Sequence, residues 1–505
     1  MPAHRSRSAL LVALLPILPL LAAAAVWAPI RDNYFWNDDF VHLYDIATRT
    51  LWSFSSELFI GQFYLVRNLV FAALFHVFGP DPRAYFWTML LTHLVNVLLL
   101  GRAIRGFTGD LVLACVGAAL WGTCPVLEGA LGWYSAYGQV LLTTLVLAVL
   151  AALGTTVARG QILEPRRALW WGALLAVGAT CYTAGLAICA AFPLTVRLAL
   201  PETQRARRSI GILILTALAI FAVYAVLRAQ SSDADVPFRE ALTGRATVAA
   251  LPGAVVLGMH LLAFGACTLV LGFLGLDRGY PSPLGVAAAA VVAGVLVLGW
   301  SRSGPVVRRQ LLGLGLLLAA VDGMTAVGRA SLFAFYREPV LTAALAPRYQ
   351  YLPLALLTLL LSIALASLAT RSQPARRAVY ATAALWALAR TVVLVARPVH
   401  IDHHDWERAE TERVVGTVRK AVAASPPGAV VRIENQTFLP AQFILHFLPG
   451  RLPGWAGIFV TVFPDNTVDG RPVRFVVSAD DWRRAQERGG RVAALVEPRS
   501  AGSNP

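Results

Sequence analysis

The run "SALLVALLPILPLLAAAAVWAP", residues 8–29, is followed at residues 34–44 by "YFWNDDFVHLY". A helix crosses the hydrocarbon core of a bilayer with about 20 apolar residues, so the first run is long enough to span it. It is also longer than the apolar part of a signal peptide, which is usually about 7 to 15 residues. We therefore expect a retained first membrane span, which brings the adjacent carboxylates Asp38 and Asp39 to one membrane surface.

Similar apolar runs recur as far as residue 396. The chain has 505 residues, of which 57% are hydrophobic and only 14% charged, and its mean hydropathy is +0.64. This composition is far more apolar than a soluble protein needs and predicts a polytopic α-helical membrane protein. The net charge of +15 does not indicate a nucleic-acid partner, because the arginines cluster between apolar runs, where they mark cytoplasmic loops. The five cysteines lie in or beside apolar runs and form no disulfide framework.

The arginine clusters predict the topology. They are "HRSR" (4–7), "GRAIRG" (101–106), "ARGQILEPRR" (158–167), "RARR" (205–208), "RSGPVVRR" (302–309) and "RSQPARR" (371–377). All six can lie in the cytoplasm if about eleven runs cross the membrane. These runs are 8–29, 84–101, 108–125, 137–158, 168–184, 185–199, 209–228, 284–300, 309–328, 350–370 and 376–396.

Two further apolar runs would place later arginine clusters outside the cell if either run crossed the membrane once. The first, 62–79, carries Arg67 and is expected to be a juxtamembrane or re-entrant helix on the outer side. The second, 248–276, is expected to dip in and return or to form two short spans, with a break near Pro252. The prediction is thus about 11 to 13 membrane helices.

This topology assigns residues 1–398 to a membrane domain, with its first external loop at 30–83, and residues 399–505 to an external domain. The tail contains a helical pattern at 405–424 and strand-like runs near 430, 457–463, 473–478 and 491–497, so we expect a small α/β domain. "HIDHHD" (400–405) is interpreted as a polar linker, because it has no recognised metal-ligand spacing. The expected location is a bacterial inner membrane with the tail outside.

The same topology gathers a set of polar and aromatic residues on the outer face. They are Asp38, Asp39, His42, Glu57, Arg67, Glu128, Tyr134, Tyr137, Asp233, Asp235, Glu240, Glu338, Arg348, Tyr349 and Tyr351. A carboxylate held among aromatic rings, or beside a second carboxylate, has a raised pKa that suits a general base. Arg348 could extend harmlessly to the interface or bind a phosphate at the membrane surface.

Three polar residues fall within predicted spans. His93 and Asn96 in "THLVN" are spaced i, i+3, and hydrogen bonds between helices are favoured over catalysis for them. Asp322 in "AAVDGMTAV" is a stronger anomaly, since a carboxylate inside a span is costly and usually functional or paired.

A family resemblance rests on the order of several motifs. The Asp pair is followed by "FYLVRNLVFAALFHVFG" (63–79), "AYFWTMLLTHLVNVLLL" (84–100), "CPVLEGALGWYSAYGQVLL" (124–142) and "RYQYLPL" (348–354). Over residues 8–396 the chain resembles the GT-C glycosyltransferases that use polyprenyl-phosphate-linked sugars, among them the protein O-mannosyltransferases. It departs from them at Asn68, where such relatives often have proline, and at Tyr182 and Thr183, where they often have a Lys-Glu pair.

The resemblance implies a membrane glycosyltransferase, mannosyltransferase-like and inverting, with a periplasmic active site. It implies that Asp38 or Asp39 is the base. It also implies that a set of residues holds the donor phosphate or substrate, namely Arg348, Tyr349, Tyr351, Arg67, Glu128 and Tyr134. The partners implied are a polyprenyl-phosphate-linked sugar, membrane lipid, and a protein, glycan or lipid acceptor. These residues point to no definite cofactor; a divalent ion, Mg²⁺ or Mn²⁺, could bind at Asp38 and Asp39.

Two other classes of protein remain open from the sequence. A secondary transporter or lipid flippase would have internal repeats and charged residues near the middle of the membrane. A non-catalytic scaffold would explain the tail but not the Asp pair together with Arg348.

Overall fold

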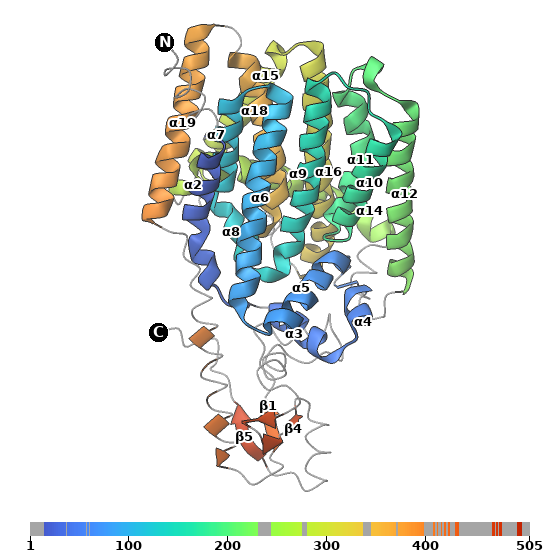
Figure 1. The fold of residues 1–505 in the computed structure, drawn as a ribbon, viewed down its shortest axis with the longest axis vertical. Coiled ribbons are helices and arrows are strands. Elements are labelled where there is room, and N and C mark those ends of the chain that lie inside the picture. Colours follow the sequence, from blue (N-terminus) through green and yellow to red (C-terminus); the bar gives the residue numbers. More distant parts are fainter. Residues whose placement is uncertain are drawn as a thin grey trace, which may run out of the picture.

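The computed structural model describes residues 15–397 except 37, 57, 60, 231–243, 275–279, 337–344 and 370–371. Beyond 397 it describes only separate residues and short strands between 408 and 496. The described chain enters a helical bundle through α2 (Ile17–Trp27) and the short helix η1 (Ala28–Asp32). The next helices, α3 (Asp38–Thr48), α4 (Leu51–Ser56) and α5 (Leu65–Phe78), lie together at the lower end of the bundle (Figure 1). The predicted outer-side helix at 62–79 therefore exists as α5.

Each predicted span that lies in the described chain corresponds to a helix. Besides α2, these helices are α6 (Pro82–Thr108), α7 (Leu111–Gly122), α9 (Tyr137–Ala158), α10 (Pro165–Ala179), α11 (Ala184–Ala199), α12 (Arg207–Gln230), α15 (Pro283–Arg302), α16 (Pro305–Tyr336), α18 (Tyr351–Ala369) and α19 (Gln373–Ala396). Local sequence fixes several starts. Asp81 accepts a hydrogen bond from the Arg83 N–H at the start of α6, and Asp110 accepts two, from Val112 and Leu113, at the start of α7.

Among the described residues, fewer helices than the predicted eleven are full-length spans. Among the described residues, eight helices are long and apolar enough to cross a membrane, or nine if α7 is counted together with the segment 125–131, which bends away from it by 52°. Helices α10 and α11 have only 15 and 16 residues. The turn between them is buried, with Thr183 accepting a hydrogen bond of 2.8 Å from the Phe63 N–H in the loop before α5.

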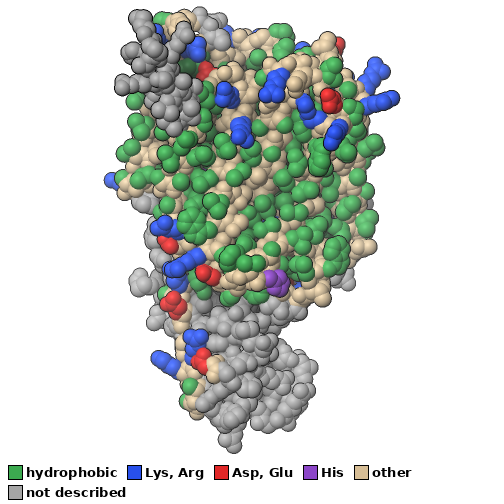
Figure 2. Space-filling model, in the orientation of Figure 1, with side chains coloured by type: hydrophobic (Ala, Val, Ile, Leu, Met, Phe, Trp, Pro, Cys, Tyr) green, Lys and Arg blue, Asp and Glu red, His purple; other side chains and the backbone are tan. Residues whose placement is uncertain are grey.

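The arginine-rich turns gather at one end of the bundle, as predicted. The end of α6 meets the end of α9 so closely that a Cβ on Gly106 would lie 2.8 Å from the Gly154 carbonyl carbon. The end of α15 is tied to the end of α18 by a 2.8 Å hydrogen bond between the Ser303 and Ser367 hydroxyls. Figure 2 shows Lys and Arg side chains in a band near the upper end of the molecule, above a broad zone of hydrophobic side chains. This arrangement supports a common side for the described arginine-rich turns.

The expected break in the segment 248–276 is wrong, because the structure has one continuous helix, α14 (Gly244–Leu271), with Pro252 inside it. A single proline removes one helical hydrogen bond, and packing against neighbouring helices can compensate for that loss. The carbonyls of Leu261 and Leu269 accept hydrogen bonds from Gln350 and Arg390, at 3.0 and 2.9 Å. Gln350 directly precedes α18 and Arg390 lies near the end of α19. Helix α14 therefore lies against the ends of these helices that are remote from the arginine-rich turns.

The tail is described only in part. Strands β4 (Arg474–Val476), β1 (Val430–Ile433) and β5 (Val492–Val496) form a parallel sheet in that order, and β2 (Thr467–Val468) pairs with β3 (Arg471–Pro472) in antiparallel fashion. Three of the four predicted strand-like runs are thus present. The run 457–463, "HIDHHD" and most of 405–424 lie outside the described residues, so the domain at 399–505 stays a prediction.

Candidate functional site

The start of α3 is fastened to the segment before α9. Asp39 is fully buried; its Oδ1 accepts hydrogen bonds from the Ser135 N–H at 2.7 Å and the Ser135 hydroxyl at 2.5 Å, and its Oδ2 accepts one from the Trp36 N–H at 3.0 Å. The indole N–H of Trp133 donates to the Trp36 carbonyl at 3.1 Å, and the two indole rings pack edge to face. Both oxygens of Asp39 are therefore occupied by contacts that position the loop.

Asp38 is placed differently from its neighbour. It is half-buried and forms no hydrogen bond to the described residues. Burial raises the pKa of the Asp38 carboxyl to about 6, although the nearby cations Arg348, Arg67 and Arg329 lower it. Burial raises the pKa of Asp39 further, to about 7, against the effect of its hydrogen bonds. Asp38 is thus a carboxyl group without a hydrogen bond to the described residues and within the electrostatic influence of three guanidinium groups.

Arg348 lies in the 3-10 helix η8 (Pro347–Gln350), directly before α18. Its Nη2 donates to the Tyr349 hydroxyl at 3.3 Å, and its guanidinium carbon lies 5.3 Å from the centre of the Trp133 ring. A close backbone contact also fixes the position of Arg348, because a Cβ on Gly129 would come within 2.4 Å of the backbone nitrogen of Arg348. Only glycine permits this approach of the segment 128–131 to η8.

Arg67 is the most unusual cation of the site. Its side chain is fully buried in α5, and none of its three guanidinium nitrogens has a hydrogen-bond partner among the described residues. Its guanidinium carbon lies 4.1 Å above the centre of the Tyr64 ring. Burial lowers the pKa of Arg67, while the nearby Tyr64, Asp39 and Asp38 raise it. A buried cation with five unused donors is costly and is suited to receive an anion.

Arg329 of α16 belongs to the same site and was not among the predicted residues. It is half-buried, its guanidinium carbon lies 5.2 Å from the centre of the Tyr349 ring, and its charge acts on the nearby Tyr182. The sequence did contain a signal, since an arginine at the end of an apolar span needs a partner or a function. Tyr182, noted before only as a departure from the family pattern, stacks on Tyr64 at 6.1 Å.

Tyr351 is placed away from these cations. Its hydroxyl is buried and bonds Nδ1 of His93 at 2.7 Å, and it also accepts from Asn96 at 3.3 Å. His93 and Asn96 further bond the carbonyls of Gly122 and Val140 on two other helices. The predicted hydrogen-bonding role of His93 and Asn96 between helices is confirmed, and these contacts give Tyr351 the same role.

The remaining predicted residues take different positions. Tyr134 is fully buried among aromatic rings, including Phe71 and Tyr85 at 4.8 and 5.0 Å, and its hydroxyl has no partner among the described residues. Glu128 is half-buried at the start of the short helix α8 (Glu128–Leu131). Asp322 is buried within α16. The other predicted acidic residues of the outer face lie outside the described part of the chain; they are Glu57, Asp233, Asp235, Glu240 and Glu338.

The donor set does not fit a divalent cation at the Asp pair. Within the described residues there is no group of three or more His, Cys, Asp or Glu side chains that could hold a metal ion. Asp39 already uses both oxygens, and Asp38 faces three positive charges that would repel a cation. The site is organised to receive negative charge.

Comparison with known proteins gives a limited result. No protein-family model and no curated protein matches the chain. The structure is similar to a crystal structure of ArnT from Cupriavidus metallidurans bound to undecaprenyl phosphate, with 13% sequence identity, coverage of 93% of this chain and 94% of that chain, and a TM-score of 0.48. A crystal structure of the same ArnT in the apo state gives 11% identity, coverage of 96% and 95%, and a TM-score of 0.46. We therefore argue the function from the residues of the site.

Proposed function

We propose that this protein is a membrane glycosyltransferase that transfers a sugar from a polyprenyl-phosphate donor to an acceptor hydroxyl. One observation carries the proposal: the half-buried carboxyl group of Asp38 lies within the electrostatic influence of three guanidinium groups, and one of these, Arg67, is buried with no hydrogen-bond partner among the described residues. A site of this kind combines a base with receptors for an anionic leaving group. Glycosyl transfer requires both, on opposite sides of one reacting carbon.

The cations would serve the donor. Arg67 and Arg348 would bind the donor phosphate through charge-assisted hydrogen bonds, and Arg329, near Tyr182 and Tyr349, would add positive charge beside it. As the bond between the anomeric carbon and the phosphate oxygen breaks, the phosphate gains negative charge that these groups stabilise. The polyprenyl phosphate leaves as a monoester, and no metal ion is needed to neutralise it.

The carboxylate would serve the acceptor. Asp38 would take the proton of the acceptor hydroxyl as its oxygen bonds to the anomeric carbon, on the face opposite the departing phosphate. Attack from that face inverts the anomeric configuration. Asp39 would act as a positioning residue, because Ser135 and Trp36 occupy its oxygens. A base with a pKa of about 6 is largely ionised at neutral pH.

The site lies at the end of the bundle opposite the arginine-rich turns, so we assign it to the outer face of the membrane. A donor with a long lipid tail favours this place, since its head group can enter the site while the tail stays in the bilayer. The hydrogen bond that Arg408 donates to the Asp32 carbonyl supports a tail on the same side. A protein, glycan or lipid acceptor could approach from this side.

Separate replacement of the two carboxylates tests the proposal. We expect Asp38→Asn to reduce transfer by at least about 100-fold, the usual contribution of a general base, with no loss of binding of undecaprenyl phosphate. Asp39→Asn should lower thermal stability as well, since the amide oxygen can still accept from Ser135 but the amide NH₂ cannot accept from the Trp36 N–H. Transfer is measured with radiolabelled polyprenyl-phosphate sugars and host membranes as the acceptor source. Full transfer by Asp38→Asn would exclude it as the base.

A further inference from the structure

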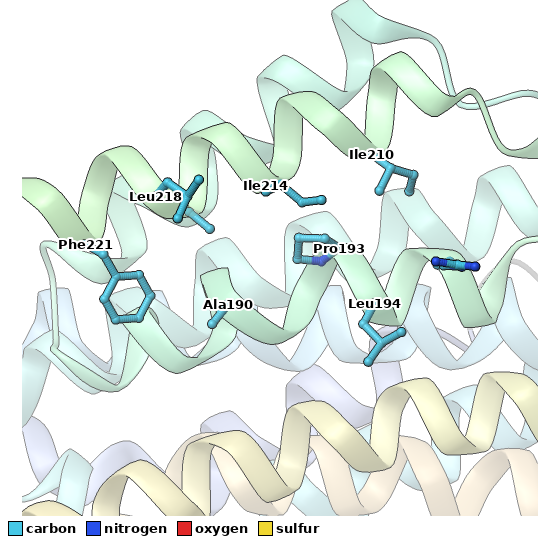
Figure 3. Close-up of a pocket in the computed structure, with 9 residues that line it drawn as sticks. Ala190, Pro193, Leu194, Ile210, Ile214, Leu218 and Phe221 are labelled. Carbon is cyan, nitrogen blue, oxygen red and sulfur yellow. The ribbon is translucent and has the colours of Figure 1, made fainter.

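A second site lies on the surface of the bundle, between α11 and α12. It is a groove of about 400 Å³ lined by nine residues, Ala190, Pro193, Leu194, Arg197, Ile210, Ile214, Ala217, Leu218 and Phe221. Figure 3 shows the labelled apolar side chains of the two helices along this groove, with Phe221 towards one end and Ile210 towards the other. Leu194, Ile214 and Leu218 are each more than 40% exposed, so the groove opens outward.

The groove exists because α11 presents little side-chain volume to α12. Ala190 has a small side chain, and Pro193, a proline inside the helix, leaves a gap in its surface where a longer side chain would project. On α12 the lining extends from Ile210 to Phe221, which is about 16 Å along the helix axis at 1.5 Å per residue. The groove is therefore long, narrow and parallel to the direction in which acyl chains lie in a bilayer.

One end of the groove carries a positive charge. Arg197 lies in the last turn of α11, beside the arginine-rich segment 205–208 that leads into α12, and it is the one charged residue of the lining. Its side chain is exposed and makes no hydrogen bond or ion pair with the described residues. By contrast, Arg205 in the same connection is paired with Glu202 at 3.6 Å. Arg197 is thus available to a ligand at the membrane surface.

We propose that this groove binds an anionic phospholipid of the inner leaflet, with one acyl chain between α11 and α12 and its phosphate at Arg197. The arginine-rich end faces the cytoplasm under the positive-inside rule, and anionic lipids are attracted to basic residues there. This lipid lies on the opposite membrane face from Asp38 and Arg348, so it is distinct from the proposed donor.

Native mass spectrometry of the full-length protein in detergent tests the proposal. The protein is titrated with dioleoyl-phosphatidylglycerol and, separately, with dioleoyl-phosphatidylcholine. We expect Arg197→Gln to weaken the tightest phosphatidylglycerol binding about fivefold, the usual effect of one basic residue at an anionic surface, and to leave phosphatidylcholine binding unchanged. The matched control is Arg166→Gln, which removes an exposed arginine at the same end of the bundle that lines no described groove.

A second pair of variants tests the acyl-chain part of the site. Ala190→Phe fills the groove and should abolish the tightest binding of both lipids, whereas Ala222→Phe, at an exposed position of α12 outside the groove, should not. Equal effects of Arg197→Gln and Arg166→Gln would overturn the proposal, as would unchanged lipid binding by Ala190→Phe. So would a protein dimer that Ala190→Phe dissociates, because the groove would then be an interface between copies. Thermal unfolding confirms that each variant is folded.

Discussion

Replacement of Arg67 by methionine should stabilise the ligand-free protein while it destroys the binding of a lipid phosphate. The guanidinium is fully buried and has no hydrogen-bond partner among the described residues, so its dehydration is only partly offset. The contact with Tyr64 at 4.1 Å offsets at most about 2 kcal/mol, whereas the cost of burying a charge is several kcal/mol. Methionine fills a similar volume without charge. We expect Arg67→Met to gain about 1–3 kcal/mol in free energy of unfolding.

The loss in binding is similar in size to this gain. Each charge-assisted hydrogen bond to the phosphate contributes about 1.5–3 kcal/mol, which is about 10- to 150-fold in affinity. At a ligand concentration of 100 times the wild-type Kd, undecaprenyl phosphate should stabilise the wild type by about 2.7 kcal/mol. A variant that binds 100-fold more weakly should gain only about 0.4 kcal/mol under the same conditions.

The assay is thermal unfolding in detergent, with and without undecaprenyl phosphate, with Arg166→Met as a control at an exposed arginine. Arg166→Met should change neither the ligand-free Tm nor its shift. If Arg67→Met instead unfolded at a lower temperature and kept the full shift with ligand, Arg67 would be a structural cation. The assignment of the phosphate site would then be refuted.

Further predictions concern pH, the hydrogen-bonded Tyr351 and a glycine contact. Transfer should fall about tenfold per pH unit below about 6, because protonation removes the base Asp38; a rate that is flat from pH 5 to 8 would contradict this. Stability should depend on the protonation of Asp39 with the opposite sign. The pKa of Asp39 in the folded protein, about 7, exceeds its ordinary value of 3.8, so the folded state binds more protons than the unfolded state. The free energy of unfolding should therefore fall as pH rises from about 4 to 7. Urea titrations of Asp39→Asn should show a weaker dependence over that range. Tyr351→Phe leaves His93 without its 2.7 Å partner and should cost about 1–3 kcal/mol of stability without any change in the Kd for undecaprenyl phosphate; a weaker Kd would return Tyr351 to the phosphate site. Gly129→Ala places a Cβ 2.4 Å from the backbone nitrogen of Arg348 and should weaken the binding of undecaprenyl phosphate at least tenfold. Gly315→Ala in α16, where a Cβ meets no atom within 4 Å, should leave this binding unchanged.

The helices could be predicted because their signal is local. Apolar runs and arginine clusters follow the chain in order, so the bounds of α12 and α15 differ from the predicted 209–228 and 284–300 by only one or two residues at each end. Local patterns fail where a helix is shortened by what packs on it. Helix α10 ends at Ala179, before its predicted bound at 184, and the turn that follows is held by a hydrogen bond between Phe63 and Thr183, which are 120 residues apart in sequence.

The site was predictable only in its broad outline. The topology placed Asp38 and Arg348 at one end of the bundle, and the structure agrees. The partner of Asp39 could not be read from the sequence, since Ser135 is 96 residues away and a serine beside an aromatic segment is not unusual. Arg329 was missed because an arginine near the end of a span usually marks only the side of the membrane on which that end lies. The position of Tyr351 depends on the rotation of α18, which an apolar helix does not reveal.

The two adjacent carboxylates need not share one task. Successive residues of a helix point about 100° apart, so Asp38 and Asp39, at the start of α3, cannot face the same surroundings. One direction leads into the protein, where Ser135 and Trp36 give Asp39 three hydrogen bonds. The other leads to Arg348, Arg67 and Arg329, where Asp38 keeps its oxygens open. Asp39 thus fixes the start of the helix, and because that start is fixed, Asp38 is held in place opposite the cations.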